Sequence, residues 1–346
     1  MSHLTYLEAA VVGVIQGVTE LFPVSSLGHN VLIPALIGGS WASDLNVARP
    51  ESPYLAFIVG MHVATAIALL IYFWRDWIRI FGGFFTSLAH WQRWHPRVAT
   101  RDEILAWMII LATIPVGLVG LVAEHTFRVL FGKPILAAVF LIVNGLILYC
   151  GEKFRSGASV RADQEIAAQR ADAQAATPPD PVPVPDGQRP ADHAAAPAGG
   201  HQAVRQEEIS QGLASDERLA SVGFKEALII GSSQILALLA GISRDGVTMV
   251  TGMARGLSRE DAARFAFLLA TPVILAAGVL KVPDLTGPLG HGIHGQILLG
   301  SVLSGLGAYV SVRFLVRYFQ TRTLYPFAIY CFVFGLLSVI YLGAIK

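Results

Sequence analysis

Apolar residues fill six long segments of the chain and leave few charged side chains inside them. Tyr54 to Trp74 and Ile104 to Ala123 contain no Asp, Glu, Lys or Arg at all. A helix needs about 20 residues to cross a bilayer. We therefore predict membrane-spanning helices over 54–74, 104–123, 134–150, 264–281, 293–316 and 325–345.

Two further apolar segments, 5–38 and 224–256, are interrupted near the middle. The first break is Phe22-Pro-Val-Ser-Ser-Leu-Gly28, and the second is Ala240-Gly-Ile-Ser-Arg-Asp-Gly246. The halves on either side are too short to cross a membrane, and irregular backbone at membrane depth is tolerated only where it lines a polar cavity. Both segments are therefore predicted to be re-entrant helix hairpins.

The two predicted hairpins also match each other at a constant offset of 218 residues. The polar and glycine pairs that match are Glu8 with Glu226, Gly13 with Gly231, Gln16 with Gln234, Ser25 with Ser243 and Gly28 with Gly246. Each half is then one hairpin followed by three spans, and an odd number of spans makes the second half enter from the opposite side. The predicted fold is an all-α polytopic membrane protein of two inverted repeats, 1–154 and 223–346, with a site near the midplane where the breaks meet.

The segment between the repeats, 155–222, has a different composition. It is rich in alanine and proline and has no aromatic residue over 156–221. Such a segment cannot bury enough apolar surface to fold alone, so a disordered insert is predicted. The 75–103 connection carries five arginines, whereas 282–292 carries no Lys or Arg. By the positive-inside rule the insert, 75–103 and 317–324 are cytoplasmic, and both termini lie outside.

The overall composition agrees with a membrane protein. The chain is 54% hydrophobic and 14% charged, whereas soluble domains carry about 25% charged residues. A net charge of +1 gives no basic field, so nucleic acid is not expected as a partner. Cys150 and Cys331 lie in apolar runs and suggest neither a disulfide framework nor a metal cluster. The N-terminus lacks a basic n-region, so no cleavable signal peptide is expected.

The first break carries candidate chemistry. Gln16 and Glu20 are four residues apart and share one helix face, and a carboxylate inside a membrane usually faces a functional cavity. One turn later come two hydroxyls, a glycine that allows close backbone approach and an imidazole: Ser25, Ser26, Gly28 and His29. A helix N-terminus binds phosphate, and a hydroxyl near a base is a candidate nucleophile. The alternatives are a buried helix contact for Gln16 and Glu20, and an ordinary N-cap for the serines.

The second break, Ser243-Arg244-Asp245-Gly246, offers a cation instead. The planar fork of Arg244 suits two-point contact with phosphate oxygens, and Thr248 adds a hydroxyl donor. The alternative is an internal ion pair with Asp245, Glu20 or Glu226. Together the two breaks suit phosphoryl transfer. Two polar residues within spans, His62 and Asn144, are expected to make helix–helix hydrogen bonds instead.

Three strings resemble a known family. Gln16-Gly-Val-Thr-Glu20-Leu-Phe-Pro-Val-Ser-Ser-Leu-Gly-His29 is similar to the first signature of the undecaprenyl-diphosphate phosphatase (bacitracin-resistance) family, and Gly241-Ile-Ser-Arg-Asp-Gly-Val-Thr248 to its second. Arg264-Phe-Ala-Phe-Leu-Leu-Ala-Thr-Pro272 resembles the family's next helix. The resemblance covers both halves and implies hydrolysis of undecaprenyl diphosphate with a divalent cation, Mg²⁺ or Ca²⁺. It also implies the bacterial inner membrane, a site open to the outer face, and roles in cell-wall synthesis and bacitracin resistance.

The resemblance also implies roles for individual residues. Glu20 would bind the metal or act as a base, Ser26 would be the candidate nucleophile, His29 a second catalytic group and Arg244 the phosphate clamp. The other residues placed around the phosphate are Ser25, Gly28, Ser243, Gly246 and Thr248. Gln16 is an allowed variant of the family's first position but supplies no charge to a metal.

The sequence departs from the family pattern in three places. Leu27 stands where Thr is usual, Ala240 replaces a Pro, and Asp245 replaces a Ser. The acid beside Arg244 could weaken anion binding or could bind the metal. The nucleophile stays open between Ser26, His29 and a metal-bound water. A homo-oligomer is also left open.

The competing function is transport. Inverted repeats with broken helices are a transporter architecture, so the alternative is a transporter or flippase of a polyprenyl phosphate lipid. A transporter needs the anion clamp at Arg244 but no nucleophile, which makes the pairing with Ser26 and His29 the feature that separates the two functions.

Overall fold

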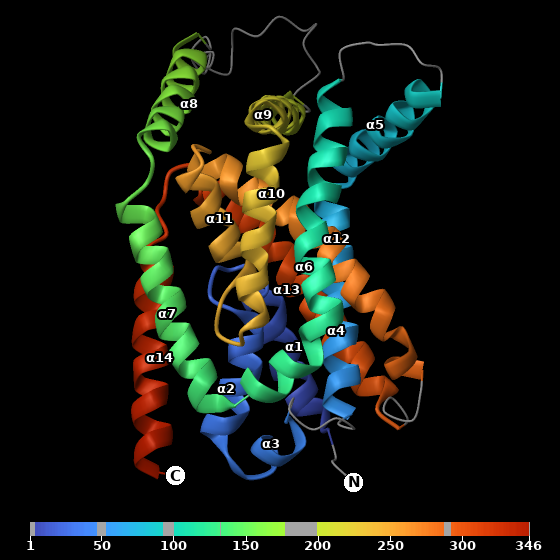
Figure 1. Ribbon diagram of the computed structural model, residues 1–346, viewed down its shortest axis with the longest axis vertical. Helices are drawn as coiled ribbons and strands as arrows, with labels where there is room; N and C mark the ends of the chain where they lie inside the picture. The colour runs from blue at the N-terminus through green and yellow to red at the C-terminus, as the bar shows by residue number, and fades with distance from the viewer. Residues whose placement is uncertain are drawn as a thin grey trace, which may run out of the picture.

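The computed structural model is entirely helical over the residues it describes, which are 4–46, 53–92, 100–131, 133–176, 199–286 and 292–345 (Figure 1). In chain order the helices are α1 Tyr6–Thr19, α2 Ser26–Ile37, α3 Gly39–Asp44, α4 Pro53–Tyr72, α5 Trp74–Gln92, α6 Arg101–Phe131, α7 Pro134–Lys153, α8 Gly157–Ala176, α9 Gly199–Val222, α10 Phe224–Ser233, the 3-10 helix η1 Gln234–Leu238, α11 Arg244–Ala254, α12 Arg259–Thr286, α13 His294–Tyr318 and α14 Tyr325–Ile345.

The predicted spans correspond to long helices. Within the described residues, five segments are long and apolar enough to cross a membrane: Arg101–Ala123, Pro134–Lys153, Arg259–Leu280, His294–Tyr318 and Tyr325–Ala344. A sixth is possible where Phe57–Tyr72 of α4 meets Trp74–Ala89 of α5 at a bend of 85°. The prediction of an all-α protein with several membrane-spanning helices is therefore confirmed.

The region after α4 differs from the connection that the sequence suggested, because most of it is the helix α5. One side of α5 is exposed at Trp74, Ile78, Phe81 and Phe85, whereas Trp77 and Ile80 are buried. The polar side chains of Asp76, Arg79 and Thr86 fall on a different face from these apolar residues, which makes α5 amphipathic. The bend turns α5 away from the direction of α4, and it lies at the end of the molecule that also holds α8 and α9 (Figure 1).

The two predicted breaks are present, and both end in a serine cap that makes the same side-chain hydrogen bond. Ser25 is the N-cap of α2 and accepts a hydrogen bond from Gly28 N at 3.2 Å. Ser243 is the N-cap of α11 and accepts one from Gly246 N, also at 3.2 Å. Two caps of the same form thus occur 218 residues apart. The inverted relation between the two halves stays a prediction.

Each hairpin packs against a span from the other half of the chain. Helix α1 lies along α13, and α10 lies along α6. Small residues let the backbones approach: a Cβ on Gly13 would lie 2.6 Å from Gly300 O, and one on Gly231 would lie 2.1 Å from Ala112 O. Of the spans, α7 packs on α14 and α4 on α12. This exchange between halves brings the two breaks to the middle of the bundle (Figure 1).

The insert is more ordered at its ends than its composition predicts. Disorder was expected over 155–222, yet the structure has helices α8 and α9 there, and the proline-rich part, 177–198, lies outside the described residues. The reason is ion pairing with the core. Asp216 of α9 is fully buried and contacts Arg79 at 2.6 Å and Arg264 at 2.9 Å. The number of apolar residues in a segment does not predict such ion pairs.

Candidate active site

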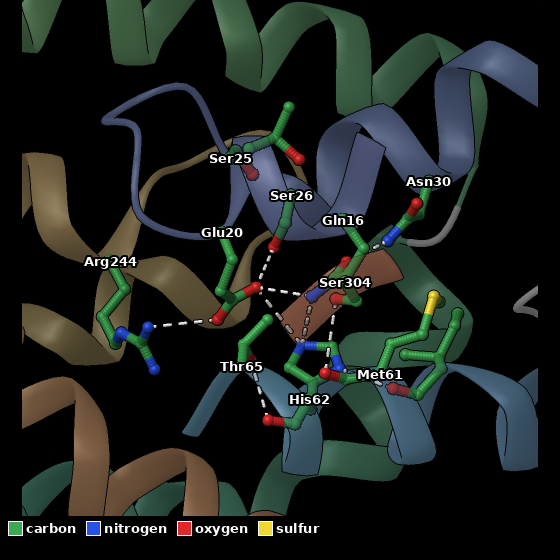
Figure 2. A network of polar contacts seen from close by, with 12 residues as sticks. Gln16, Glu20, Ser25, Ser26, Asn30, Met61, His62, Thr65, Arg244 and Ser304 are labelled. Atoms are coloured by element: carbon green, nitrogen blue, oxygen red, sulfur yellow. Dashed lines mark hydrogen bonds and ion pairs between the residues drawn. The ribbon is translucent and has the colours of Figure 1, made fainter. Parts of the chain in front are cut away.

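Glu20 lies at the centre of a polar cluster where the two breaks meet (Figure 2). It is the C-cap of α1 and is 8% exposed. Its Oε2 accepts hydrogen bonds from Ser26 Oγ at 2.5 Å and from Gln16 Nε2 at 2.7 Å. Its Oε1 accepts one from Arg244 Nη2 at 3.1 Å. The arrangement is that of a buried acidic side chain facing a hydroxyl on one oxygen and a guanidinium on the other.

Arg244 approaches Glu20 from the other hairpin as the first residue of α11. Its Nη2 bonds Glu20, and its Nε lies 3.3 Å from Asp245 Oδ1. The internal ion pair weighed for this arginine is thus present with both Glu20 and Asp245. Glu226, the third candidate, pairs instead with Arg255, at 2.7 Å between Oε1 and Nη2. A half-buried guanidinium between two acids can give up one of them for a phosphate oxygen.

His62 of α4 is a member of the cluster that the sequence did not assign to the site. Its Nε2 lies 3.5 Å from Glu20 Oε2 and 3.3 Å from Gln16 Nε2, and its Nδ1 lies 2.9 Å from Ile58 O. The expected helix–helix hydrogen bond is present, but its partner helix carries the central carboxylate. The signal that could have found it is an ionisable side chain inside a span otherwise free of charge.

Gln16 is held by three partners and thereby orients Glu20. Its amide nitrogen donates to Glu20 and faces His62, while its Oε1 accepts from Asn30 Nδ2 at 2.5 Å. Both ends of the amide are engaged, so this geometry leaves no oxygen of Gln16 directed at a metal. Asn30 of α2 is a second residue that sequence reasoning missed.

Ser25 joins the two breaks directly. It has a φ of 69°, the one positive value at a non-glycine among the described residues. Its Oγ accepts from Gly28 N in its own hairpin and from Gly241 N in the other, both at 3.2 Å. The backbones touch here, because a Cβ on Gly28 would lie 2.9 Å from Gly241 Cα. In this geometry Ser25 and Gly28 hold the breaks together.

Asn144 of α7 makes a second bridge between the breaks. Its Nδ2 donates to Pro23 O at 3.0 Å, and its Oδ1 accepts from Ser243 N at 2.9 Å. The expected helix–helix contact is therefore a contact to the irregular backbone of both hairpins. Such a bridge satisfies polar groups that membrane lipid cannot.

The remaining phosphate-binding candidates support the start of α11. Ser243 Oγ and Gly246 N bond each other. Thr248 is buried and donates its hydroxyl to Arg244 O at 2.7 Å. These three residues fix the backbone that carries Arg244, and none of their hydrogen bonds among the described residues is to Glu20 or Ser26.

His29 lies apart from the cluster. It is 2% exposed, its Nδ1 lies 2.8 Å from Ser25 O, and its Nε2 lies 2.8 Å from the hydroxyl of Tyr330 on α14. Its ring also stacks on Phe334, with centroids 5.3 Å apart. Both nitrogens are engaged, and no contact among the described residues joins His29 to Glu20, Ser26 or Arg244. The structure thus brings three of the four predicted catalytic residues together.

The carboxylates fit a hard cation that takes further ligands from a substrate. The described residues contain no group of three or more His, Cys, Asp or Glu side chains placed to hold a metal. However, Asp245 Oδ2 is buried and has no hydrogen-bond partner among those residues, while Oδ1 faces Arg244. Mg²⁺ is commonly bound by one or two carboxylates together with substrate phosphates. Glu20 and Asp245, on either side of Arg244, match that requirement.

Comparison with known proteins agrees with this geometry. A family model described as "Bacitracin resistance protein BacA" matches residues 9–175 and 198–337. A protein named undecaprenyl-diphosphatase from Mycolicibacterium paratuberculosis is 54% identical over 342 residues, covering 99% of both chains. Undecaprenyl-diphosphatase 2 of Frankia alni is 51% identical over 354 residues and 98% of both chains. The protein of that name from Chromobacterium violaceum is 37% identical over 97% of this chain and 98% of its own.

Proposed function

The chain belongs to the bacitracin resistance protein BacA family, and we propose from its site how it hydrolyses undecaprenyl diphosphate to undecaprenyl phosphate and inorganic phosphate. It is a multi-pass membrane phosphatase that serves cell-wall synthesis, and the family name connects it with bacitracin resistance. One observation carries the proposed mechanism. Glu20 accepts the hydroxyl of Ser26 at 2.5 Å on one oxygen and the guanidinium of Arg244 on the other.

In the proposed first step, Ser26 Oγ attacks the terminal phosphorus and its proton passes to Glu20 Oε2. The bond from that phosphorus to the bridging oxygen breaks, and undecaprenyl phosphate leaves with the electron pair. In the second step a water attacks the phosphoserine and the bond from phosphorus to Oγ breaks. Oγ takes back the proton held by Glu20, and the protons of the water leave with inorganic phosphate as H2PO4⁻. A carboxylate within hydrogen-bond reach of a hydroxyl is the arrangement that both steps need.

Arg244 is the proposed phosphate clamp. Its fork can bind two oxygens of one phosphate, and half-burial strengthens that contact relative to water. When Arg244 turns from Glu20 to the substrate, Glu20 loses a cationic neighbour and binds a proton more strongly. Substrate binding would therefore prepare Glu20 to accept the proton of Ser26.

Glu20 and Asp245 are the residues proposed to hold a divalent cation. When bound, Mg²⁺ or Ca²⁺ would offset the negative charge of the diphosphate. Asp245 is suited to this role because one of its oxygens has no other partner among the described residues. Gln16 is better assigned to the orientation of Glu20, since both ends of its amide are engaged.

We place the protein in the bacterial inner membrane with its site open to the outer face. Helices α5, α8 and α9, which all carry arginines, lie at one end of the molecule, and the start of α1 and the end of α14 lie toward the other (Figure 1). The positive-inside rule assigns the arginine-rich end to the cytoplasm. A flippase for the same lipid would need Arg244 but not a hydroxyl paired with a carboxylate, so the contact of Ser26 with Glu20 favours hydrolysis.

The test is phosphate release from undecaprenyl diphosphate by purified protein in detergent, with Mg²⁺, with Ca²⁺ or with EDTA, beside Arg244→Ala. We expect release that depends on the cation, and a loss of about a hundredfold or more in Arg244→Ala, as when other electrostatic clamps are removed. Well-folded protein that releases no phosphate with either metal would contradict the proposed function.

A further inference from the structure

Helix α5 carries an apolar stripe that the described part of the protein leaves uncovered. Trp74, Ile78, Phe81 and Phe85 follow one another at intervals of three or four residues, so they share one face of the helix. Each of these four side chains is at least half exposed. An exposed apolar patch of this kind marks a surface that contacts a membrane or another protein.

The other side of α5 is fixed to the rest of the protein. Arg79 Nη2 pairs with Asp216 Oδ2 of α9 at 2.6 Å. A Cβ on Gly83 would lie 2.5 Å from the carbonyl carbon of Asp102, so the backbones of α5 and α6 touch there. Because these contacts hold the helix from one side, the apolar stripe is directed away from the protein.

The contacts of α5 also fix its level relative to the membrane-spanning helices. Its second half lies against the start of α6, where Trp107 Nε1 donates to Ser87 Oγ at 2.9 Å. That start belongs to Arg101–Ala123, which is long and apolar enough to cross a membrane. Its first residue, Trp74, follows α4 at a bend of 85°. Helix α5 therefore runs between the ends of two apolar helices, at the level where such helices meet water.

Continuity with α4 indicates what covers the apolar stripe. Helix α4 contains no Asp, Glu, Lys or Arg, and it exposes Ile67 and Ile71 shortly before Trp74. The surface that α4 presents to lipid thus leads directly into the stripe. A bilayer continues along that surface, whereas a protein partner would have to interrupt it.

Arg75 places a positive charge beside the stripe. Its guanidinium lies over the ring of Trp74, with 5.1 Å between the guanidinium carbon and the ring centroid. Among the described residues no carboxylate lies within ion-pair distance of Arg75, whereas Arg79 contacts Asp76 at 2.5 Å and Asp216 at 2.6 Å. Basic and aromatic residues at the edge of an apolar face are typical of helices that lie at a bilayer surface and attract anionic headgroups.

We propose that α5 is an interfacial helix that lies in the plane of the bilayer and binds anionic phospholipid. The apolar stripe enters the acyl region of the leaflet, and Arg75 contacts the lipid phosphates. The leaflet is the one on the side of α8 and α9 (Figure 1), which the positive-inside rule assigns to the cytoplasm. This surface is independent of the chemistry at Glu20.

The first test measures how deep the apolar stripe lies in vesicles of phosphatidylcholine and phosphatidylglycerol. Nitroxide labels are attached one at a time to Ile78→Cys, Phe81→Cys and Phe85→Cys of the full chain. The background is Cys150→Ser, because Cys150 is exposed, whereas Cys331 is fully buried and is kept. Collision rates of each label with oxygen and with a water-soluble nickel chelate give its depth, after a size-exclusion check of folding.

We expect the three stripe labels to lie at one depth, between two reference labels. Leu306→Cys, exposed midway along α13, is the deep reference, and Glu217→Cys, exposed on α9, is the water reference. Seven residues of helix cover about 10 Å, so an upright α5 would change depth by that amount from position 78 to position 85. Such a change would overturn the proposal, and so would water exposure of all three labels equal to that of Glu217→Cys.

The second test concerns the charge of Arg75. A fluorescent bimane on Ile78→Cys is quenched by doxyl-labelled phosphatidylglycerol or phosphatidylcholine at equal mole fraction. We expect phosphatidylglycerol to be enriched about fivefold beside the label, typical of one arginine at an anionic surface. Arg75→Gln should abolish this enrichment, whereas Arg161→Gln, which removes an exposed arginine of α8, should retain it.

Equal quenching by the two lipids with Arg75 present would overturn the binding of anionic phospholipid, and so would an enrichment that survives Arg75→Gln. Neither test measures phosphate release. A protein that hydrolyses no lipid diphosphate would therefore contradict the proposed function and leave the results on α5 unchanged.

Discussion

Ser26 opens α2 and Arg244 opens α11, at matching positions of the two broken hairpins 218 residues apart. Both side chains reach the same carboxylate, Ser26 at Oε2 and Arg244 at Oε1. The carboxylate has no counterpart, since Leu238 stands 218 residues after Glu20. The hairpins thus share the same order of helix, break and helix but contribute different groups to the cluster. The first contributes Glu20 and the hydroxyl of Ser26, and the second contributes the guanidinium of Arg244. Their difference at matching positions is what makes the site.

The hairpins also differ in how their first helices end. Helix α1 continues to Thr19 with Glu20 as its cap, whereas α10 stops at Ser233 and tightens into the 3-10 helix η1. Gln16 consequently reaches Glu20, while its counterpart Gln234 is buried with its Oε1 unpaired among the described residues. Among the described residues, the first hairpin thus orients a carboxylate by a glutamine one turn earlier, and the second hairpin has no acid at the matching position.

The largest expected effect comes from removing that carboxylate's charge. Glu20→Gln keeps the shape of the side chain but cannot take the proton of Ser26, so we expect phosphate release to fall by about a thousandfold. The matched control in the other hairpin is Glu226→Gln, which removes an acid paired with Arg255. It should retain near-parental activity. Equal losses of activity in the two variants would contradict the assignment of the proton-accepting carboxylate to the first hairpin.

A smaller effect is expected where the breaks touch. A Cβ on Gly28 would lie 2.9 Å from Gly241 Cα, which is backbone, whereas one on Gly246 would first meet the side chain of Leu148 at 3.1 Å. We expect Gly28→Ala to lower the free energy of unfolding by about 2 kcal/mol, within the range for overpacking. Gly246→Ala should cost less, because Leu148 can move. Thermal unfolding in detergent measures both, and the reverse order would contradict the contact.

The smallest expected effect concerns metal affinity. Asp245→Ser restores the residue typical of the family and removes an acid beside Arg244. If Asp245 holds the cation, the Mg²⁺ concentration for half-maximal phosphate release should rise about tenfold, comparable to other changes around bound metals. Ser243 is also next to Arg244 but carries no carboxylate, so Ser243→Ala should leave this Mg²⁺ concentration unchanged. An unchanged Mg²⁺ requirement in Asp245→Ser would remove Asp245 from the metal site.

Much of this arrangement could be predicted from the sequence because it depends on patterns among neighbouring residues. Long apolar runs predicted the spans, and Gly, Pro and Ser inside shorter runs predicted the breaks. The contact of Glu20 with Ser26 follows from six residues of separation, and that with Arg244 follows once the breaks are expected to meet. Their roles in catalysis stay predictions until activity is measured.

The contacts that escaped prediction depend on packing between distant segments. His62 reaches Glu20 from α4, and His29 turns toward Tyr330 on α14, and no spacing rule connects these positions. The order of α9 likewise depends on Asp216 meeting two arginines from α5 and α12. Composition describes how much apolar surface a segment can bury, and it does not describe charges that meet only in the folded bundle.

The hydroxyl of Ser25 has a consequence for how the protein is made. It accepts one backbone N–H from residue 28 and another from residue 241. The first break therefore leaves the ribosome before its partner exists, because the remaining spans of the first half, the insert and the start of the second half must follow first. A nascent chain that has completed its first half holds Glu20 and Ser26 but lacks the residues that close the site around them. Under the proposed mechanism, a chain truncated before Arg244 would lack the phosphate clamp and would not hydrolyse lipid diphosphates.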